Sequence, residues 1–228
     1  MAILRFPSVE TAGPEGLLAV GGDLEVPSLK LAYESGVFPW PNEDFPLLWF
    51  APPLRAILKF EELRVPPRLH RELKGKKFHF SVDRNFPAVI KACAEGSTRK
   101  SWGTWITLRM IEAYIRFHRA GYAHSFECYD EKDRLVGGMY GVSIGGMFAG
   151  ESMFFTESGA SKAVLLFAIA YLREQGAQWM DIQMLSPLLQ RLGAKEIPRT
   201  VFMEKLRAAL AEKPLWPSAP SESSLKRR

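Results

Sequence analysis

Hydrophobic and polar residues alternate in two short stretches of the chain's first half, and each alternation predicts a β-strand. The stretches are residues 56–60 and 78–82, and a basic segment lies between them. Residues 86–94 are rich in apolar side chains and predict a helix. The spacing of apolar residues from Thr107 to Gly121 predicts the next helix, which the threonine hydroxyl caps and the glycine ends.

The second half of the chain contains well-marked turns between apolar runs, which indicate a three-stranded antiparallel meander followed by further elements. The predicted strands are 124–129, 135–144 and 147–155; they are followed by a helix at 161–175, a strand at 178–184 and a short helix at 188–192. This order is similar to the acetyltransferase-like (GNAT-like) fold, in which a central mixed sheet splays open to hold an acyl donor. The fold class expected is therefore α+β, and fold alone does not give the substrate.

Residues 1–60 predict a small, turn-rich N-terminal α/β domain. A short helix is expected from Val26 to about Ser35, and residues 38–41 and 47–53 predict two rigid aromatic loops because each proline fixes its own φ. The aromatic clusters form either a small core or a surface for stacking flat rings. We expect the larger GNAT-like domain at 61–212 and a disordered basic tail at 213–228.

Composition limits the class of protein. The chain has 228 residues, of which 47% are apolar and 12% aromatic, enough to bury a sizeable core. Its apolar runs are shorter than the ~20 residues of a membrane helix, and its first residues lack a signal-peptide pattern, so a cytoplasmic location is expected. Cys93 and Cys128 are expected to be free thiols. Neither they nor the four histidines show metal-ligand spacing, and no metal or membrane association is expected.

The net charge of +5 is unevenly distributed. Six Lys or Arg residues and one Glu lie between Arg64 and Lys77, and Arg68, Arg71 and Lys74 recur at a spacing of three residues, on one side of a short predicted helix. Such a face suits contacts with phosphates, because each neutralised phosphate releases counterions. A solvated helix face explains the charges equally well.

The strand predicted at 178–184 carries polar residues in an apolar setting. Alternation places Asp181 and Gln183 on one face, about 7 Å apart, with Met180, Ile182 and Met184 on the other. A carboxylate among apolar residues is costly to bury without a partner, so it often has a function. The alternative is an ordinary aspartate that is hydrogen-bonded to a loop.

Many short segments, in one order, resemble the leucyl/phenylalanyl-tRNA–protein transferases. The resemblance covers about Gly16 to Arg199. The matching segments are Gly16-Leu-Leu-Ala, Gly21-Gly-Asp-Leu24, Phe38-Pro-Trp40, Leu48-Trp49, Pro52, Arg55-Ala56, Gly103-Thr-Trp-Ile-Thr107, Gly121, Ala123-His-Ser125, Leu135-Val-Gly-Gly-Met-Tyr-Gly-Val142, Gly150-Glu-Ser-Met-Phe154, Ala160-Ser-Lys162, Asp181 with Gln183, Leu192-Gly-Ala194 and Glu196-Ile-Pro-Arg199.

The resemblance implies transfer of Leu or Phe, with Met as a further candidate, from aminoacyl-tRNA to the N-terminal Arg or Lys of a protein, which creates a degradation signal. An aminoacyl ester is already activated, so aminolysis requires correct placement of a neutral amine and no cofactor. The α-amine has a pKa near 8. Asp181 is the candidate to take or attract its proton, directly or through Gln183.

The resemblance also implies the substrate contacts. It places the pocket for the Leu or Phe side chain among Trp105, Met139, Phe148 and Met153, because methionines accept both aliphatic and aromatic guests. Trp49 resembles the stacking platform for the terminal adenosine of the tRNA. Glu151, with Ser152 beside it, is expected to meet the positively charged acceptor. The basic helix with Arg68, Arg71 and Lys74 becomes the candidate for acceptor-stem phosphates.

The chain departs from the family pattern at a few positions. Ile182 stands where the family often has Cys, Leu188 where it commonly has His, and Arg191 where it has a small residue; we expect Ile182 to face away from the site. Two other functions remain open, an acetyl-CoA-dependent N-acetyltransferase and a non-catalytic tRNA-binding protein. The turn at 156–161 lacks the Gly-rich pattern that cradles pyrophosphate, which disfavours the acetyltransferase.

Overall fold

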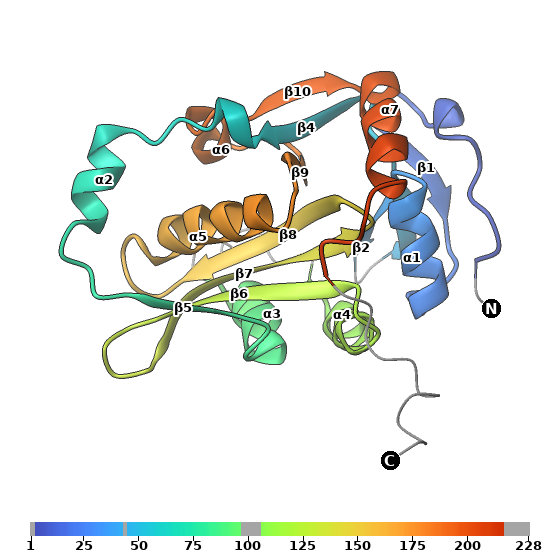
Figure 1. Ribbon diagram of the computed structural model, residues 1–228. Helices are drawn as coiled ribbons and strands as arrows, with labels where there is room; N and C mark the ends of the chain where they lie inside the picture. Colours follow the sequence, from blue (N-terminus) through green and yellow to red (C-terminus); the bar gives the residue numbers. More distant parts are fainter. Residues whose placement is uncertain (1–2, 43–44, 97–105, 217–228) are drawn as a thin grey trace, which may run out of the picture.

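The computed structural model describes residues 3–42, 45–96 and 106–216. Two β-sheets form its centre (Figure 1). The smaller has the order β1-β3-β2 and is antiparallel, with β1 (Leu17–Val20), β2 (Phe38–Asn42) and β3 (Phe45–Phe50). The larger has the order β10-β4-β9-β8-β7-β6-β5, with β4 (Leu54–Lys59), β5 (His79–Val82), β6 (Ala123–Tyr129), β7 (Leu135–Ile144), β8 (Met147–Phe155), β9 (Trp179–Gln183) and β10 (Lys195–Pro198).

Helices cover both faces of the larger sheet. In Figure 1, α5 lies on one face of strands β6–β8, and α3 and α4 lie on the opposite face. The helices are α1 (Val26–Glu34), α2 (Pro67–Leu73), α3 (Phe86–Glu95), α4 (Leu108–Arg119), α5 (Ala160–Glu174), α6 (Pro187–Arg191) and α7 (Arg199–Leu210), with short 3-10 helices at Val9–Thr11 and Phe60–Glu62. As predicted, the Thr107 hydroxyl caps α4 by accepting from the Met110 N–H at 3.3 Å.

The larger sheet is mixed, and its one parallel pairing is short. All its neighbouring strands are antiparallel except β8 and β9. These two pair in parallel at only two positions, Phe148 with Met180 and Ala149 with Asp181. Beyond those positions the strands are no longer paired, although both continue. The splayed sheet expected from the element order is therefore present, and the fold class is α+β, as predicted.

The two aromatic segments of the N-terminal part are strands rather than the rigid loops that the prolines predicted. Residues 38–42 form β2, and residues 45–50 form β3. β2 lies at the edge of the small sheet, where a proline removes no inner ladder hydrogen bond, so the chain tolerates Pro39 there. β4, which we assigned to the N-terminal domain, pairs within the larger sheet. β10 and α7 were not predicted.

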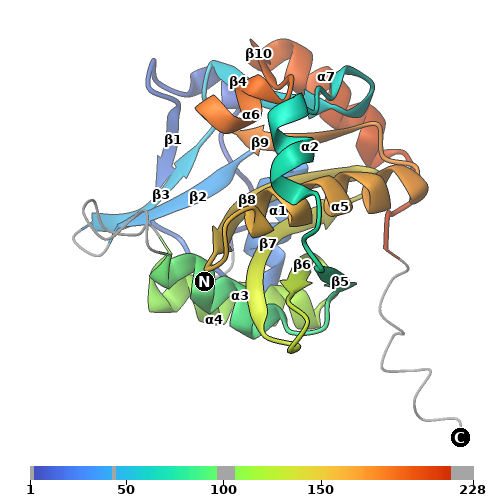
Figure 2. The same ribbon diagram turned by 90° about the vertical axis from the view of Figure 1, so that its left-hand side faces the viewer.

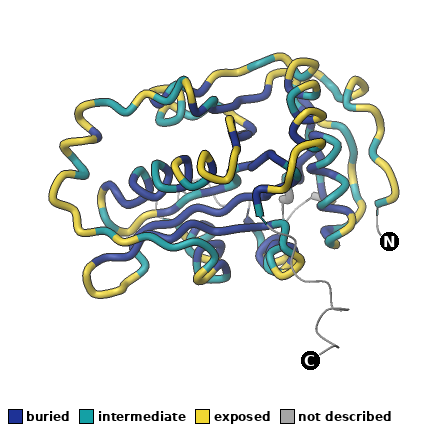
Figure 3. The backbone as a smooth tube through the Cα atoms, in the orientation of Figure 1, coloured by how far each residue is buried: buried dark blue, intermediate teal, exposed yellow. Residues whose placement is uncertain are grey.

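The chain packs against the sheet further toward its C-terminus than expected. Leu215 is buried, and the Trp216 ring stacks on His124 with ring centroids 3.9 Å apart. The disordered tail predicted from residue 213 is therefore wrong for residues 213–216, and residues 217–228 lie outside the described part. Figure 3 shows the central strands β6 and β7 of the large sheet buried and α2 largely exposed. Among the described residues, none of the helices is long and apolar enough to span a bilayer.

Candidate active site

A cavity of about 470 Å³ opens in the splay between β8 and β9. Its walls are mostly apolar, and they come from the small sheet as well as from the large sheet and its helices. β2 contributes Phe38, Pro39 and Trp40, whereas Met139, Leu165, Met180 and Leu188 come from β7, α5, β9 and α6. A concave apolar cavity with a few polar groups is the usual form of a small-molecule site. The polar groups here lie on the two splayed strands.

Glu151 points into this cavity because of a β-bulge in β8. Tyr140 pairs with Ser152 and Gly141 pairs with Gly150, so Glu151 is an extra residue without a partner on β7. A bulge bends its strand and changes the direction of a side chain, and bulges are common beside active sites. Gly141 permits this irregularity, since a Cβ there would lie 2.3 Å from the Ala149 carbonyl oxygen.

Gln183 reaches the same cavity through an unusual turn at the end of β9. Its φ is +52°, and the Met184 N–H donates to the Ile182 carbonyl oxygen at 2.6 Å. A bond between residues i and i+2 around a positive φ is the rare and strained form of γ-turn. The turn breaks the strand's alternation: Gln183 lines the cavity together with Met180 and Ile182, whereas Asp181 does not.

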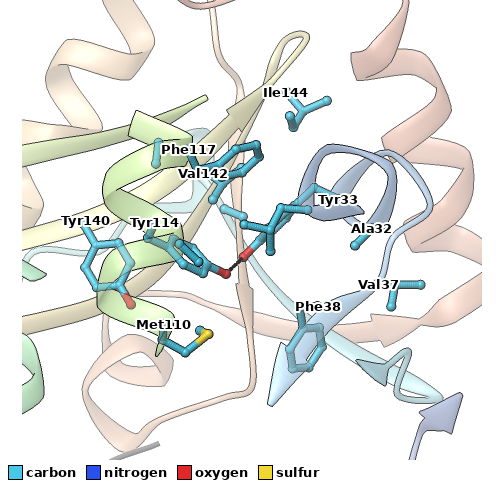
Figure 4. Close-up of a cluster of buried hydrophobic side chains, with 14 of the residues drawn as sticks. Ala32, Tyr33, Val37, Phe38, Met110, Tyr114, Phe117, Tyr140, Val142 and Ile144 are labelled. Carbon is cyan, nitrogen blue, oxygen red and sulfur yellow. Dashed lines mark hydrogen bonds between the residues drawn. The ribbon is translucent and has the colours of Figure 1, made fainter. Parts of the chain in front are cut away.

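The Glu151 carboxylate is the centre of a hydrogen-bonded chain. Its Oε1 accepts from the Tyr33 hydroxyl and from Gln183 Nε2, each at 2.8 Å. The Tyr33 hydroxyl also contacts the Tyr114 hydroxyl, and Figure 4 shows these two rings meeting from α1 and α4. Burial, and secondarily the negative charge of Asp181, raise the pKa of Glu151 to about 8, against the opposing effect of its hydrogen bonds.

Asp181 is fully buried, with 0% of its surface exposed, and it forms an ion pair with Arg55. Arg55 Nε and Nη2 donate to the two carboxylate oxygens at 2.8 and 2.6 Å, which is the bidentate geometry of strong pairs. The guanidinium lies 4.6 Å from the ring centroids of both Phe38 and Phe202. Asp181 Oδ1 also accepts from the Gln183 N–H at 3.0 Å, so the pair supports the turn.

The structure brings only some of the predicted site residues together. Gln183, Met139, Glu151, Ser152 and Met153 line the cavity. Phe148 does not: it is fully buried and packs against Phe126 and Trp216. Trp105 lies outside the described residues.

Trp49 has no open ring face. It is 1% exposed, its Nε1 donates to the Gly21 carbonyl oxygen at 2.8 Å, and its ring packs edge-on against Phe6. Trp40, on the adjacent strand, lines the cavity instead. Trp40 and Trp49 belong to the two aromatic segments for which we expected either a core or a stacking surface. Alternation alone did not show which tryptophan has which role.

Two departures from the family pattern also line the cavity. Ile182 was expected to face away from the site, but this orientation is wrong, because Ile182 lines the cavity and Asp181 points to the other face. Leu188 lines it from α6. Sequence reasoning assigned no role to Arg55 or Tyr33, which hold Asp181 and Glu151 in place. Only their partners in the folded structure show these roles.

The three basic residues predicted to contact phosphates are exposed. Arg68 and Arg71 lie on α2, whereas Lys74 follows its last turn in an extended conformation. Glu72, on another side of the helix, accepts from Lys162 Nζ at 2.7 Å and from the Ser158 hydroxyl at 3.3 Å, which fixes α2 against the first turn of α5 (Figure 2). A carboxylate therefore lies at the helix start where an acetyl-CoA enzyme needs room for pyrophosphate.

Asp83, His118 and His124 are close enough to hold a metal ion, with one ligand atom of each within 4.8 Å of the others. Protein groups already engage these atoms. His124 Nδ1 contacts Asp83 Oδ2 at 2.7 Å, and His118 Nδ1 donates to the Ala123 carbonyl oxygen at 2.7 Å. The arrangement fits a hydrogen-bonded clamp at the start of β6 better than an open metal site.

Comparison with known sequences gives one consistent answer. Residues 57–207 match the family model of the leucyl/phenylalanyl-tRNA protein transferase, and residues 22–53 match that of its N-terminal domain. The leucyl/phenylalanyl-tRNA–protein transferase of Anaeromyxobacter dehalogenans (strain 2CP-C) is 45% identical over 207 residues, covering 91% of this chain and 88% of its own. That of Methylococcus capsulatus is 45% identical over 222 residues, covering 95% and 94%.

Similarity to solved structures is weaker. FemX has a TM-score of 0.47 at 11% sequence identity, covering 75% of this chain and 66% of its own. L-PGS from Bacillus licheniformis has a TM-score of 0.42 at 12% identity, covering 67% and 49%. These distant similarities carry no argument about activity.

Proposed function

The chain belongs to the leucyl/phenylalanyl-tRNA–protein transferase family, and we propose that its acceptors are proteins that begin with Arg or Lys. It moves Leu or Phe from aminoacyl-tRNA to the α-amino group of that first residue, creating a degradation signal in the cytoplasm. The observation that carries the proposal is the hydrogen bond between Gln183 and Glu151 in the wall of an apolar cavity. In its ionised form the Glu151 carboxylate attracts a cationic acceptor, and the apolar walls suit a Leu or Phe side chain.

In the proposed reaction, Glu151 receives the proton of the amine. The nitrogen, now neutral, attacks the ester carbonyl, a C–N bond forms and the bond to the ribose oxygen breaks. The nitrogen loses a second proton as the amide forms; of the two protons, one is passed to the ribose oxygen and the other is released to solvent. Because burial raises the pKa of Glu151 to about 8, this carboxyl matches an α-amine whose pKa is near 8, the condition for efficient proton transfer. Gln183 and Tyr33 orient the carboxylate through their hydrogen bonds.

The role of Asp181 as the proton acceptor stays a prediction. Its burial in the ion pair with Arg55 favours Glu151 for that step and an orienting role for Asp181, exerted through the Gln183 N–H. Met139 and Met153 bind the transferred side chain, with Met180 and Leu165 beside them. The Trp40 ring is better placed than Trp49 to contact the terminal adenosine, since only Trp40 lines the cavity.

The test is transfer of label from [¹⁴C]Leu-tRNA to matched peptides that begin with Arg, Lys or Ala. We expect label in the first two and none in the third. Glu151→Gln should lower kcat/KM by at least about a hundredfold, the lower range for general-base action, whereas the exposed control Glu196→Gln should leave it unchanged. Equal labelling of the Ala peptide would reject the acceptor assignment, and full activity of Glu151→Gln would reject the role of that carboxyl.

A further inference from the structure

The edge of β8 that borders the cavity is not paired with a neighbouring strand. Pairing with β9 stops at Ala149 and Asp181, and β8 continues to Phe155. In an antiparallel pair, alternate residues point their N–H and C=O groups away from the partner strand. Along Glu151–Phe155 those groups point away from β7, toward the space that β9 has left. Such an edge is a template for another extended chain.

A second observation indicates that the segment Glu151–Phe155 binds a polar ligand. The Ser152 hydroxyl is buried and, within the described residues, has no hydrogen-bond partner, although Ser152 lines the cavity. Buried polar groups in proteins nearly always find partners, so an exception beside a cavity points to a ligand. The β8 segment thus offers both backbone groups and a hydroxyl to an occupant of the splay.

We propose that the β8 edge from Glu151 to Phe155 binds the N-terminal segment of the acceptor as an added β-strand, an inference that rests on the proposed function. The acceptor's amine lies at Glu151, where the splay is closed by the Glu151–Gln183 contact. Its chain then runs outward in the same direction as β8 and β9, which are themselves parallel, so the inserted strand is parallel to both. Strand addition of this kind is a recurring mode of peptide binding.

The dimensions of the edge set the number of acceptor residues that it holds. From Glu151 to Phe155 a strand advances roughly 13 Å, at about 3.3 Å per residue, which accommodates about four acceptor residues. The open end is flanked by exposed apolar side chains, Phe155 at 43% and Met184 at 53% exposure. Backbone pairing reads no side chains, so the enzyme selects the first residue by charge and accepts varied sequences after it.

The test uses acceptor peptides that begin with Arg and carry one N-methyl group on the amide of residue 2, 3, 4 or 8. N-methylation removes a single donor and leaves the side chains unchanged. A strand pairs with its neighbour through alternate residues. At saturating [¹⁴C]Leu-tRNA, we therefore expect methylation to lower kcat/KM at least tenfold at every second position within residues 2–4. Methylation at residue 8 should have no effect.

Equal rates for all the methylated peptides would overturn the proposal, as would a loss as large at residue 8 as at residues 2–4. If the unmodified Arg peptide is not labelled, the proposed function itself fails; if it and all its methylated forms are labelled equally, only strand addition fails. Equal labelling of the unmodified and methylated peptides is also the result expected if the β8 edge holds the end of the tRNA instead of the acceptor.

A second measurement locates the strand on β8. Phe155→Cys and the control Leu108→Cys both place a thiol at an exposed apolar position, the first at the mouth of the splay and the second on α4. An Arg peptide with cysteine at residue 4, activated as a mixed disulfide, should cross-link to Phe155→Cys at least tenfold faster. Equal cross-linking rates for the two variants would contradict the proposal.

Discussion

At the scale of single residues, protonation of Glu151 makes the stability of the fold depend on pH. Burial is the main cause of its pKa of about 8, and the negative charge of Asp181 adds to it. An unfolded chain releases this proton near pH 4.5, the ordinary pKa of a glutamate. Between these two values the folded protein binds more protons than the unfolded chain, so the contribution of Glu151 to stability falls as the pH rises.

Glu151→Gln should therefore stabilise the protein relative to the native sequence at pH 8.5 and much less at pH 5. We expect a difference of about 2 kcal/mol between the two conditions, below the full linkage value because solvent screens a partly exposed carboxylate. Urea unfolding at both pH values measures it, with the exposed Glu196→Gln as the control. A Glu151→Gln effect that is the same at both pH values would contradict a carboxyl that keeps its proton up to about pH 8 in the folded protein.

At the scale of elements, β9 shows where sequence reasoning succeeds and fails. Alternation correctly separated Asp181 from Met180 and Ile182, but it placed the cavity on the wrong face. The reason is local: the γ-turn at Gln183 and the bulge at Glu151 bring their side chains together. Neither irregularity changes the pattern of hydrophobic positions, so periodicity cannot reveal them.

The other elements also separate into those that the sequence predicts and those that it does not. The β6–β8 meander and α4 were predicted because turns and a capping threonine mark their ends in the sequence. β10 is short and mostly exposed, so it carries no clear alternation. The sequence assigned Arg55 no partner, and only the distant Asp181, 126 positions later, explains its burial.

The ion pair between Arg55 and Asp181 should behave as a coupled unit. Arg55→Met and Asp181→Asn should each cost about 3–5 kcal/mol of unfolding free energy, since each removes one partner of a buried pair. The double variant should cost at least ~2 kcal/mol less than the sum, because no uncompensated charge is left buried. Denaturant unfolding of the four proteins gives the coupling energy.

Lys77 and Glu131 provide the matched control, because their ion pair is exposed at 71% and 60% of the side chains. The double-mutant cycle with Lys77→Met and Glu131→Gln should give a coupling energy between zero and about 1 kcal/mol. If the two cycles gave equal coupling energies, the pair of Arg55 and Asp181 would have no special role in holding β4 to β9.

At the scale of the whole molecule, the cavity depends on both sheets. Phe38 lines it from β2 and also lies against the Arg55 guanidinium, which connects the small sheet to β4 and β9. α2 projects from the body, as Figure 1 shows, and the ion pair between Glu72 and Lys162 fixes it beside α5. Exposed basic residues on α2 and a reaction site in the same molecule suit a substrate that is both large and polyanionic.

Arg71→Ala should weaken binding of Leu-tRNA and make it less dependent on salt. If the guanidinium neutralises one phosphate, the slope of log K against log salt concentration should become shallower by about 1, because one fewer counterion is released. Lys91→Ala on α3 removes an exposed cation from the opposite side of the sheet and should leave both affinity and slope unchanged. Filter binding between 50 and 200 mM salt separates the two variants, the range over which phosphate contacts dominate the change in affinity. Parallel lines for Arg71→Ala, Lys91→Ala and the native protein would show that α2 is merely a solvated helix and that the tRNA binds elsewhere.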